Sequence, residues 1–181
     1  MLNFEGGIYM VLLLIGPSGS GKKAFKSACK DYGIRVIKSC TTKPKADETI
    51  YKFLTDEQFN TLIRNDELLE WVVYNNHKYG TLRNDFTKNC VTIVDKDAIY
   101  KLLKIYAGKV FVIYFNVSED VCRKRCLERG EDPILVEEKL KNDINKLKGF
   151  DKSLANMIIH DEDLSRFNSI IKENITKWVV R

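Results

Sequence analysis

Hydrophobic and polar positions alternate along this chain in blocks that predict strands and helices in turn. Residues 8–15 form a continuous apolar run, which is typical of a parallel strand covered on both faces. Shorter apolar runs at residues 34–37, 91–94, 110–117 and 157–159 predict four further strands. Strands that alternate with helices indicate an α/β fold with a parallel central sheet and right-handed crossovers.

The segments between these runs have helical periodicity. Ser118 and the two acidic residues after it predict the start of a helix that runs to residue 129, and a polar helix follows to about residue 148. Residues 97–106 predict a further helix. Residues 22–30 predict a short helix whose inward positions are Ala24, Phe25, Ala28 and Cys29. The final helix is predicted from an apolar face made of Leu164, Phe167, Ile171, Ile175 and Trp178.

The alternation of predicted strands and helices is interrupted between residues 39 and 89. Residues 51–53 predict a short strand, and Thr55 with Gln58 has the capping-box pattern of a helix start. Phe59 and Leu62, with Ile63, would lie on one face of that helix. We interpret residues 39–89 as a subdomain inserted into one domain of residues 1–181, whose core is residues 8–38, 90–129 and 147–181.

Composition narrows the class of protein. A chain of 181 residues that is 44% hydrophobic suits one folded domain, and its net charge of +5 weakly favours anionic partners. No basic block indicates a nucleic-acid partner. The five cysteines form no CxxC pair and the chain has two histidines, so we expect reduced thiols and no zinc site. The apolar run at residues 8–15 is too short to span a membrane, and we expect a cytoplasmic protein.

A phosphate-binding loop is the strongest local motif. The GxxxxGK pattern is formed by Gly16, Pro17, Ser18, Gly19, Ser20, Gly21 and Lys22. The glycines let backbone N–H groups approach phosphate oxygens, the following helix adds its N-terminal dipole, and Lys22 can reach the outer phosphates. An apolar strand before the loop and a helix after it supply the context that the motif requires, so we expect ATP to bind here.

Lys23 departs from this pattern. The residue after the loop lysine is normally Ser or Thr, whose hydroxyl is a ligand of Mg²⁺. An ammonium group cannot bind a cation, so catalysis is less firmly predicted than nucleotide binding.

Several short motifs in a fixed order make the chain resemble the guanylate kinase family over nearly its whole length. They are the loop Gly16 to Lys22; Ser39-Cys40-Thr41-Thr42-Lys43-Pro44-Lys45; Asp47-Glu48 followed by Tyr51 and Phe53; Leu69-Glu70-Trp71; Tyr79-Gly80-Thr81; Asp95; Arg125; Arg129-Gly130; and Ile158-Ile159-His160-Asp161. The resemblance implies a P-loop kinase that transfers the γ-phosphate of ATP, bound with Mg²⁺, to GMP or dGMP. It also implies a helical lid at about residues 130–146.

The resemblance also implies roles for individual residues. Lys22, Arg125 and Arg129 would act on the transferring phosphate. The acceptor phosphate would be surrounded by Ser39, Lys43, Lys45, Tyr51 and Tyr79, and the guanine would face Glu70, Thr81 and Asp95. A carboxylate suits guanine because it can accept from both N1–H and the 2-amino group, whereas adenine turns a lone pair toward it.

Simpler interpretations exist for several of these residues. Glu70 could be a solvated carboxylate at a helix end, and Asp95 could only cap the next helix. The tyrosines could be half-buried core rings. Arg125 and Arg129, four residues apart, could belong to a solvated basic face.

The departures from the family pattern leave two other functions open. Lys43 and Lys45 stand where arginines are expected, the loop before Tyr51 looks shortened, and a third lid arginine looks replaced by Lys139. Lysine lacks the bidentate fork of arginine. The chain could therefore be a guanylate-kinase-like binding or interaction module with weak or no activity, or a kinase of another phosphorylated acceptor.

Overall fold

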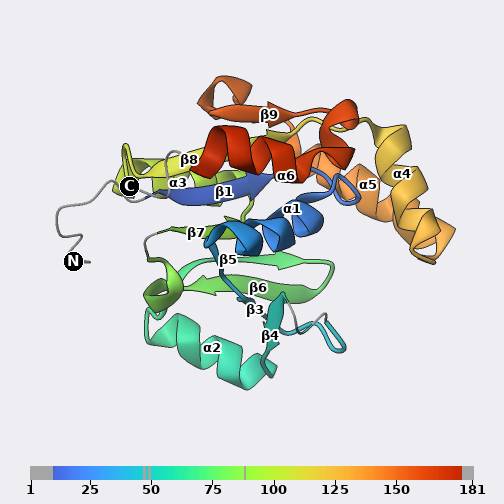
Figure 1. The fold of residues 1–181 in the computed structure, drawn as a ribbon. Helices are drawn as coiled ribbons and strands as arrows, with labels where there is room; N and C mark the ends of the chain where they lie inside the picture. The colour runs from blue at the N-terminus through green and yellow to red at the C-terminus, as the bar shows by residue number, and fades with distance from the viewer. Residues whose placement is uncertain (1–9, 47, 49, 88, 177–181) are drawn as a thin grey trace.

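The computed structural model describes residues 10–46, 48, 50–87 and 89–176 (Figure 1). Ile8, Asp47 and Trp178, which entered the predictions above, lie outside the described residues. A five-stranded sheet has the order β2-β7-β1-β8-β9, and every pairing within it is parallel. Its strands are β1 (Val11–Ile15), β2 (Arg35–Val36), β7 (Cys90–Ile93), β8 (Val110–Phe115) and β9 (Met157–Ile159). The predicted parallel α/β sheet is confirmed.

Helices cover both faces of this sheet, which explains why β1 is apolar at every position. Leu12 and Leu14 pack with Phe25 of the P-loop helix in one buried cluster, whereas Leu13 packs with Ile99 in a second cluster on the opposite face. The helices are α1 (Lys22–Ala28), α3 (Lys96–Ile105), α4 (Glu119–Glu128), α5 (Pro133–Leu147) and α6 (Phe167–Ile170).

A second, four-stranded sheet lies beneath the first in Figure 1, in the order β4-β3-β6-β5. Its strands are β3 (Ser39–Thr41), β4 (Tyr51–Phe53), β5 (Leu68–Tyr74) and β6 (His77–Leu82), and α2 (Asp56–Arg64) packs on its outer face. The predicted capping box of α2 is confirmed: Thr55 and Gln58 bond to each other's backbone N–H. Phe59 is buried, with Leu62 and Ile63 packed beside it.

The β5–β6 hairpin was not predicted, although its turn carries a recognisable signal. Asn75 and Asn76 both have positive φ, 48° and 61°, which is the backbone of a tight type I′ hairpin turn that asparagine favours. Leu68 and Leu69 before the turn are buried, while Trp71 and Val73 are exposed, so the polar-apolar alternation is incomplete.

Several element boundaries differ from the predictions. The strand expected at residues 34–37 is reduced to β2, and the P-loop helix gives way after Ala28 to a 3-10 turn (Cys29–Tyr32). Ala24 was predicted to face inward but is exposed, and Lys26 is buried instead. Ser118 stands at the N-cap of α4, but its hydroxyl donates to Asp161 rather than to the helix. Further short 3-10 segments are Arg83–Asp85, Lys152–Leu154 and Asp161–Ser165.

The final helix is also irregular. It continues from α6 into a π-helical segment (Ile171–Ile175), and Phe167, Ile171 and Ile175 are buried as predicted, whereas Leu164 lies in the preceding 3-10 segment. All five cysteines are buried thiols without a disulfide. Among the described residues, none of the helices is long and apolar enough to cross a bilayer.

Candidate active site

The P-loop needs its glycines because neighbouring backbone leaves no room for side chains. Gly16, Gly19 and Gly21 have φ of 151°, 81° and 93°, a region that residues with a Cβ rarely adopt. A Cβ added at Gly16 would lie 2.7 Å from Cβ of Phe115, and one added at Gly19 would collide with the carbonyl of Cys122. The loop is therefore held tightly between the end of β8 and the first turns of α4.

Lys22 is folded back across this loop. Its ammonium donates to the carbonyls of Gly16 and Pro17, both at 2.6 Å, and lies 3.3 Å from the hydroxyl of Ser20. Desolvation by burial lowers the pKa of Lys22 to about 8, and the nearby carboxylate of Asp143 offsets part of that effect. To reach a bound phosphate, Lys22 must exchange these carbonyls for phosphate oxygens.

A carboxylate from the predicted lid occupies the P-loop. Oδ2 of Asp143, in α5, accepts from the backbone N–H of Ser18 at 2.6 Å, and Oδ1 accepts from the hydroxyl of Tyr74 at 3.0 Å. The Asp143 side chain is 8% exposed. Burial, together with this carboxylate, raises the pKa of Tyr74. An anion therefore already lies on a loop N–H of the kind that binds phosphate, and it ties the β5–β6 hairpin to α5.

The two predicted arginines differ in their surroundings. Nε of Arg125 donates to the carbonyl of Gly19 at 3.0 Å, so its guanidinium lies against the P-loop. Arg129 instead pairs with Glu131 at 2.6 Å, and Lys139 reaches the other oxygen of Glu131 at 2.8 Å. Burial opposes ionisation of Glu131, but the hydrogen bonds from Lys139 and Arg129 prevail and lower its pKa. The structure thus brings Arg125 to the loop and holds Arg129 in an ion pair beside it.

Five of the eight residues predicted to bind the acceptor share one face of the four-stranded sheet, which we call the acceptor face. Alternate residues of a strand point the same way, and directly paired residues do so too. Tyr79 and Thr81 alternate in β6, and Thr81 pairs with Glu70 of β5. The register of β3 and β4 places Ser39 and its partner Tyr51 on this face as well. The opposite face packs against α2.

The half-buried Glu70 and the buried Thr81 form a polar pair. Desolvation raises the pKa of Glu70 to about 7, and the neighbouring polar groups of Thr81 offset part of that rise. The hydroxyl of Thr81 is fully buried and makes no hydrogen bond of good geometry with the described residues. Glu70 belongs to β5, so the interpretation of it as a helix-end carboxylate is wrong.

Asp95 has the simpler of the two roles that the sequence left open, that of a helix cap, and its role toward guanine stays a prediction. One of its oxygens accepts from the N–H of Ala98 at 2.8 Å, which caps α3. Its negative charge also raises the pKa of Glu70, so the two carboxylates are electrostatic neighbours.

An aromatic pair on the four-stranded sheet lies near the P-loop helix. The rings of Tyr51 and Tyr79 meet edge to face with centroids 5.7 Å apart. The ammonium of Lys23 lies 5.3 Å from the centroid of the Tyr51 ring. Lys23 therefore reaches from α1 toward the four-stranded sheet. Lys43 and Lys45 are exposed in the loop after β3, and Lys45 has a positive φ of 53°.

Comparison with known proteins gives a consistent result. The guanylate kinase family model matches residues 9–177. A guanylate kinase of Thermotoga maritima is 32% identical over 167 residues, which are 83% of this chain and 81% of that protein. A guanylate kinase of Polaromonas sp. is 29% identical over 154 residues, 78% and 73% of the two chains. The crystal structure of guanylate kinase from Anaplasma phagocytophilum has a TM-score of 0.67 at 16% identity, covering 97% of this chain and 89% of that one, a likeness of fold.

Proposed function

We propose that this chain, which belongs to the guanylate kinase family, transfers the γ-phosphate of ATP to GMP or dGMP and releases ADP with GDP or dGDP. Family membership implies a nucleoside monophosphate kinase. The observation that carries the choice of a guanine acceptor is the pair formed by the half-buried Glu70 and the buried Thr81 on one face of the four-stranded sheet.

This pair complements the pairing edge of guanine. The Glu70 carboxylate can accept from N1–H and the 2-amino group together, and the buried Thr81 hydroxyl can donate to O6. Each group is costly to leave unpaired in a buried site. Adenine would set a lone pair against the carboxylate, so binding AMP would leave both groups unsatisfied, and such sites discriminate strongly.

The acceptor phosphate would lie at the other end of the same face. Ser39, Tyr51 and Tyr79 share one face of the sheet, and the Tyr51 ring lies beneath the ammonium of Lys23 from the P-loop helix. Lys43 and Lys45 would add charge from the loop after β3. A phosphate bound at the tyrosines would then face the γ-phosphate of an ATP bound at the P-loop.

Transfer then depends on positioning and on neutralising charge. An oxygen of the acceptor phosphate attacks the γ-phosphorus, the bond from that phosphorus to the bridging oxygen of ADP breaks, and ADP leaves with that electron pair. Lys22 and Arg125 would stabilise the transferring group from the loop side. Arg129 would join them after leaving Glu131, and Asp143 must leave the loop before phosphate can enter.

Mg²⁺ is expected with ATP, and Lys23 stands in place of the hydroxyl that is usually one of its ligands. Phosphate oxygens and water would therefore be the ligands, as Mg²⁺ commonly accepts. When bound, the ion neutralises phosphate charge.

The test is ADP release from ATP with each nucleoside monophosphate in turn, with the product identified by chromatography. We expect rapid ADP release with GMP or dGMP, slow release with AMP, CMP and UMP, and loss of activity in Lys22→Met. Equal rates with AMP would refute the guanine assignment. No ADP above background with any acceptor would favour the binding-module alternative.

A further inference from the structure

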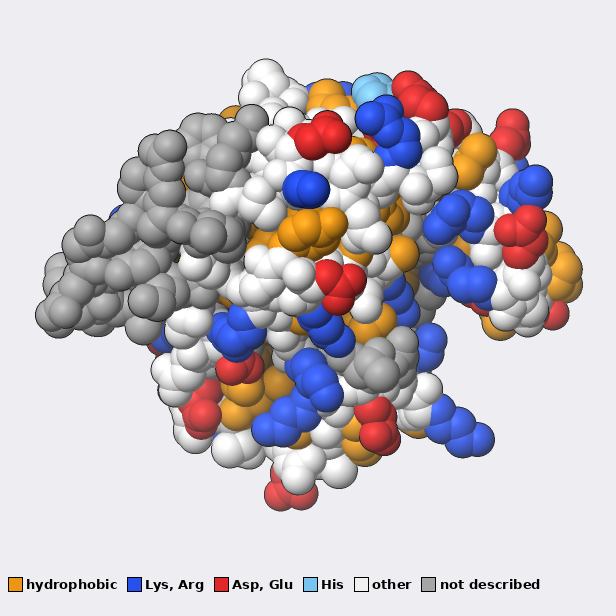
Figure 2. Space-filling model, viewed as in Figure 1, with side chains coloured by type: hydrophobic (Ala, Val, Ile, Leu, Met, Phe, Trp, Pro, Cys, Tyr) orange, Lys and Arg blue, Asp and Glu red, His pale blue; other side chains and the backbone are white. Residues whose placement is uncertain are grey.

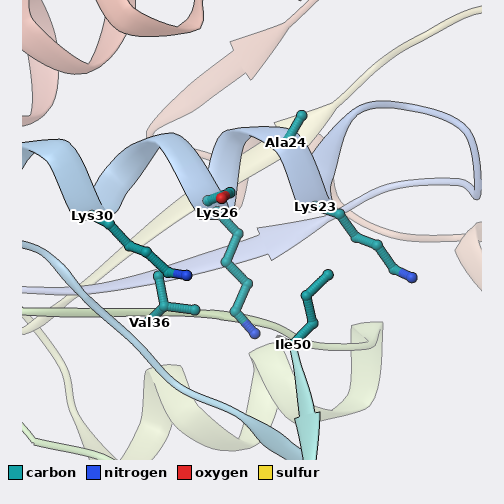
Figure 3. Close-up of a pocket in the computed structure, with 7 residues that line it drawn as sticks. Lys23, Ala24, Lys26, Lys30, Val36 and Ile50 are labelled. Carbon is teal, nitrogen blue, oxygen red and sulfur yellow. The ribbon is translucent and has the colours of Figure 1, made fainter. Parts of the chain in front are cut away.

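A basic cavity lies on the side of α1 that faces Val36 and Ile50. It has a volume of about 260 Å³, and its walls include Lys23, Lys26 and Lys30 of α1 and the adjoining turn, with Val36 and Ile50 opposite (Figure 3). The three lysine side chains leave the helix on the same side (Figure 3). Figure 2 shows Lys and Arg side chains gathered over this part of the surface, where α1 meets the four-stranded sheet.

Lys26 is the unusual member of this cavity. It is 1% exposed, and its ammonium group has no hydrogen-bond partner among the described residues. Burial, together with the charges of Lys23 and Lys30, lowers the pKa of Lys26 to about 8. An amine buried without a partner destabilises the fold, so its presence calls for a compensating group.

We propose that this cavity binds a small phosphoryl oxyanion. The shared chemistry is a tetrahedral phosphate group of charge near −2, which could be free phosphate, pyrophosphate or the phosphate of a bound nucleotide. Three ammonium groups around one space favour a compact multivalent anion, and each can donate to it. Small-molecule pockets typically hold about 300–1,000 Å³, so this smaller cavity suits a phosphate group rather than a whole nucleotide.

The cavity is separate from the P-loop but is connected to the acceptor site. Lys22 turns into the loop, whereas the next residue, Lys23, lines the cavity and also lies over the ring of Tyr51. Ile50 precedes Tyr51 directly. An anion in the cavity would therefore change the electrostatic potential at the predicted acceptor phosphate. The proposal does not depend on which nucleotide is the acceptor.

The experiment measures anion binding with the two nucleotide sites filled. Saturating ADP and GMP would occupy the P-loop and the acceptor face, and inorganic phosphate and pyrophosphate would then be titrated while the melting temperature and the ¹³Cε signals of the lysines are recorded. We expect both probes to raise the melting temperature and to shift the Lys26 signal, with pyrophosphate acting at lower concentration.

Variants separate this cavity from other sites. Lys26→Met should melt at a higher temperature than the wild type without added anion, because a buried amine is replaced by an apolar chain, and should lose at least about tenfold in anion affinity. Lys30→Gln, at an exposed position, should weaken binding without harming the fold. Lys124→Gln on α4 removes the same charge elsewhere and should respond like the wild type.

The source of the phosphate group follows from a second titration. If the anion is free, Lys26→Met leaves GMP affinity unchanged in phosphate-free buffer and abolishes the response to phosphate. If the acceptor's own phosphate fills the cavity, bound GMP shifts the Lys26 signal and Lys26→Met weakens GMP binding. The proposal is overturned if neither probe nor GMP moves the Lys26 signal, or if Lys26→Met and Lys124→Gln respond alike.

Discussion

Replacing Asp143 by asparagine should strengthen ATP binding. In the free protein, the Asp143 carboxylate accepts from the Ser18 N–H at 2.6 Å and from the Tyr74 hydroxyl at 3.0 Å. ATP phosphates need the same loop, so this contact must break before they bind. An asparagine keeps the shape and one acceptor oxygen, but it removes the negative charge that competes with phosphate.

The size of the effect follows from the contact that is lost. Hydrogen bonds to charged groups contribute about 1.5–3 kcal/mol and neutral ones about 0.5–1.5 kcal/mol, so the substitution weakens the competing contact by about 1–1.5 kcal/mol. The apparent dissociation constant equals the intrinsic constant divided by the fraction of protein that is competent to bind. ATP should therefore bind about five to ten times more tightly to Asp143→Asn, while the ligand-free variant should melt at a lower temperature.

Isothermal titration with a non-hydrolysable ATP analogue measures this directly. Glu138→Gln is the matched control, because it removes one carboxylate from an exposed position of the same helix. It should leave nucleotide affinity unchanged. Unchanged or weaker nucleotide binding in Asp143→Asn would refute the idea that Asp143 competes with phosphate, and would make it a residue that supports the loop.

Four further predictions concern other parts of the site. Because burial raises the pKa of Glu70 to about 7, kcat/KM for GMP should rise between pH 6 and 8 at saturating ATP, and Glu70→Gln should remove the rise. The same raised pKa contributes stability that is fully present below pH 4.5 and is lost as the pH rises through about 7. The melting temperature of the wild type should therefore fall relative to that of Glu70→Gln over this pH range, and a constant difference between the two proteins would contradict it. Arg125→Ala should lower kcat by a factor of about 10²–10³, whereas Arg123→Ala, the control, should have little effect on kcat. Equal losses in the two variants would show that Arg125 acts only as part of a solvated basic surface. Lys23→Ser restores a hydroxyl and should lower the Mg²⁺ concentration for half-maximal rate; a variant that needs as much metal and turns over more slowly would show that Lys23 had become a working part of the site.

The parts of the fold that follow from local chemistry were predictable. The P-loop joins an apolar strand to a helix, so its position in the sheet is set by adjacent residues. The capping box of Thr55 and Gln58 likewise depends on residues three apart. The ends of strands and helices were predicted less accurately, because tertiary packing decides where an element stops. The 3-10 turn that follows Ala28 is one example.

The residues that were missed act over long distances. Asp143 reaches a loop 125 positions earlier in the chain, and nothing around it in a polar helix distinguishes it from the other charges of α5. Lys26 was overlooked because a lysine on a short helix is normally solvated, and only tertiary packing around α1 buries it. The acceptor face could be anticipated only from the order of motifs, since the register that assembles it is set by the unpredicted β5–β6 hairpin.

The central claim is that Glu70 accepts hydrogen bonds from the pairing edge of guanine. The most direct test compares two acceptors, GMP and IMP, in two proteins, the wild type and Glu70→Gln. IMP keeps N1–H and O6 but lacks the 2-amino group, so it removes one donor to Glu70 and leaves the rest of the acceptor intact. Measured as kcat/KM at saturating ATP and pH 8, the wild type should prefer GMP to IMP by about 1–3 kcal/mol, the scale of a good paired contact to a base. In Glu70→Gln most of that preference should disappear. A GMP preference that is the same in both proteins would show that Glu70 does not contact the base, and would contradict the proposed acceptor site.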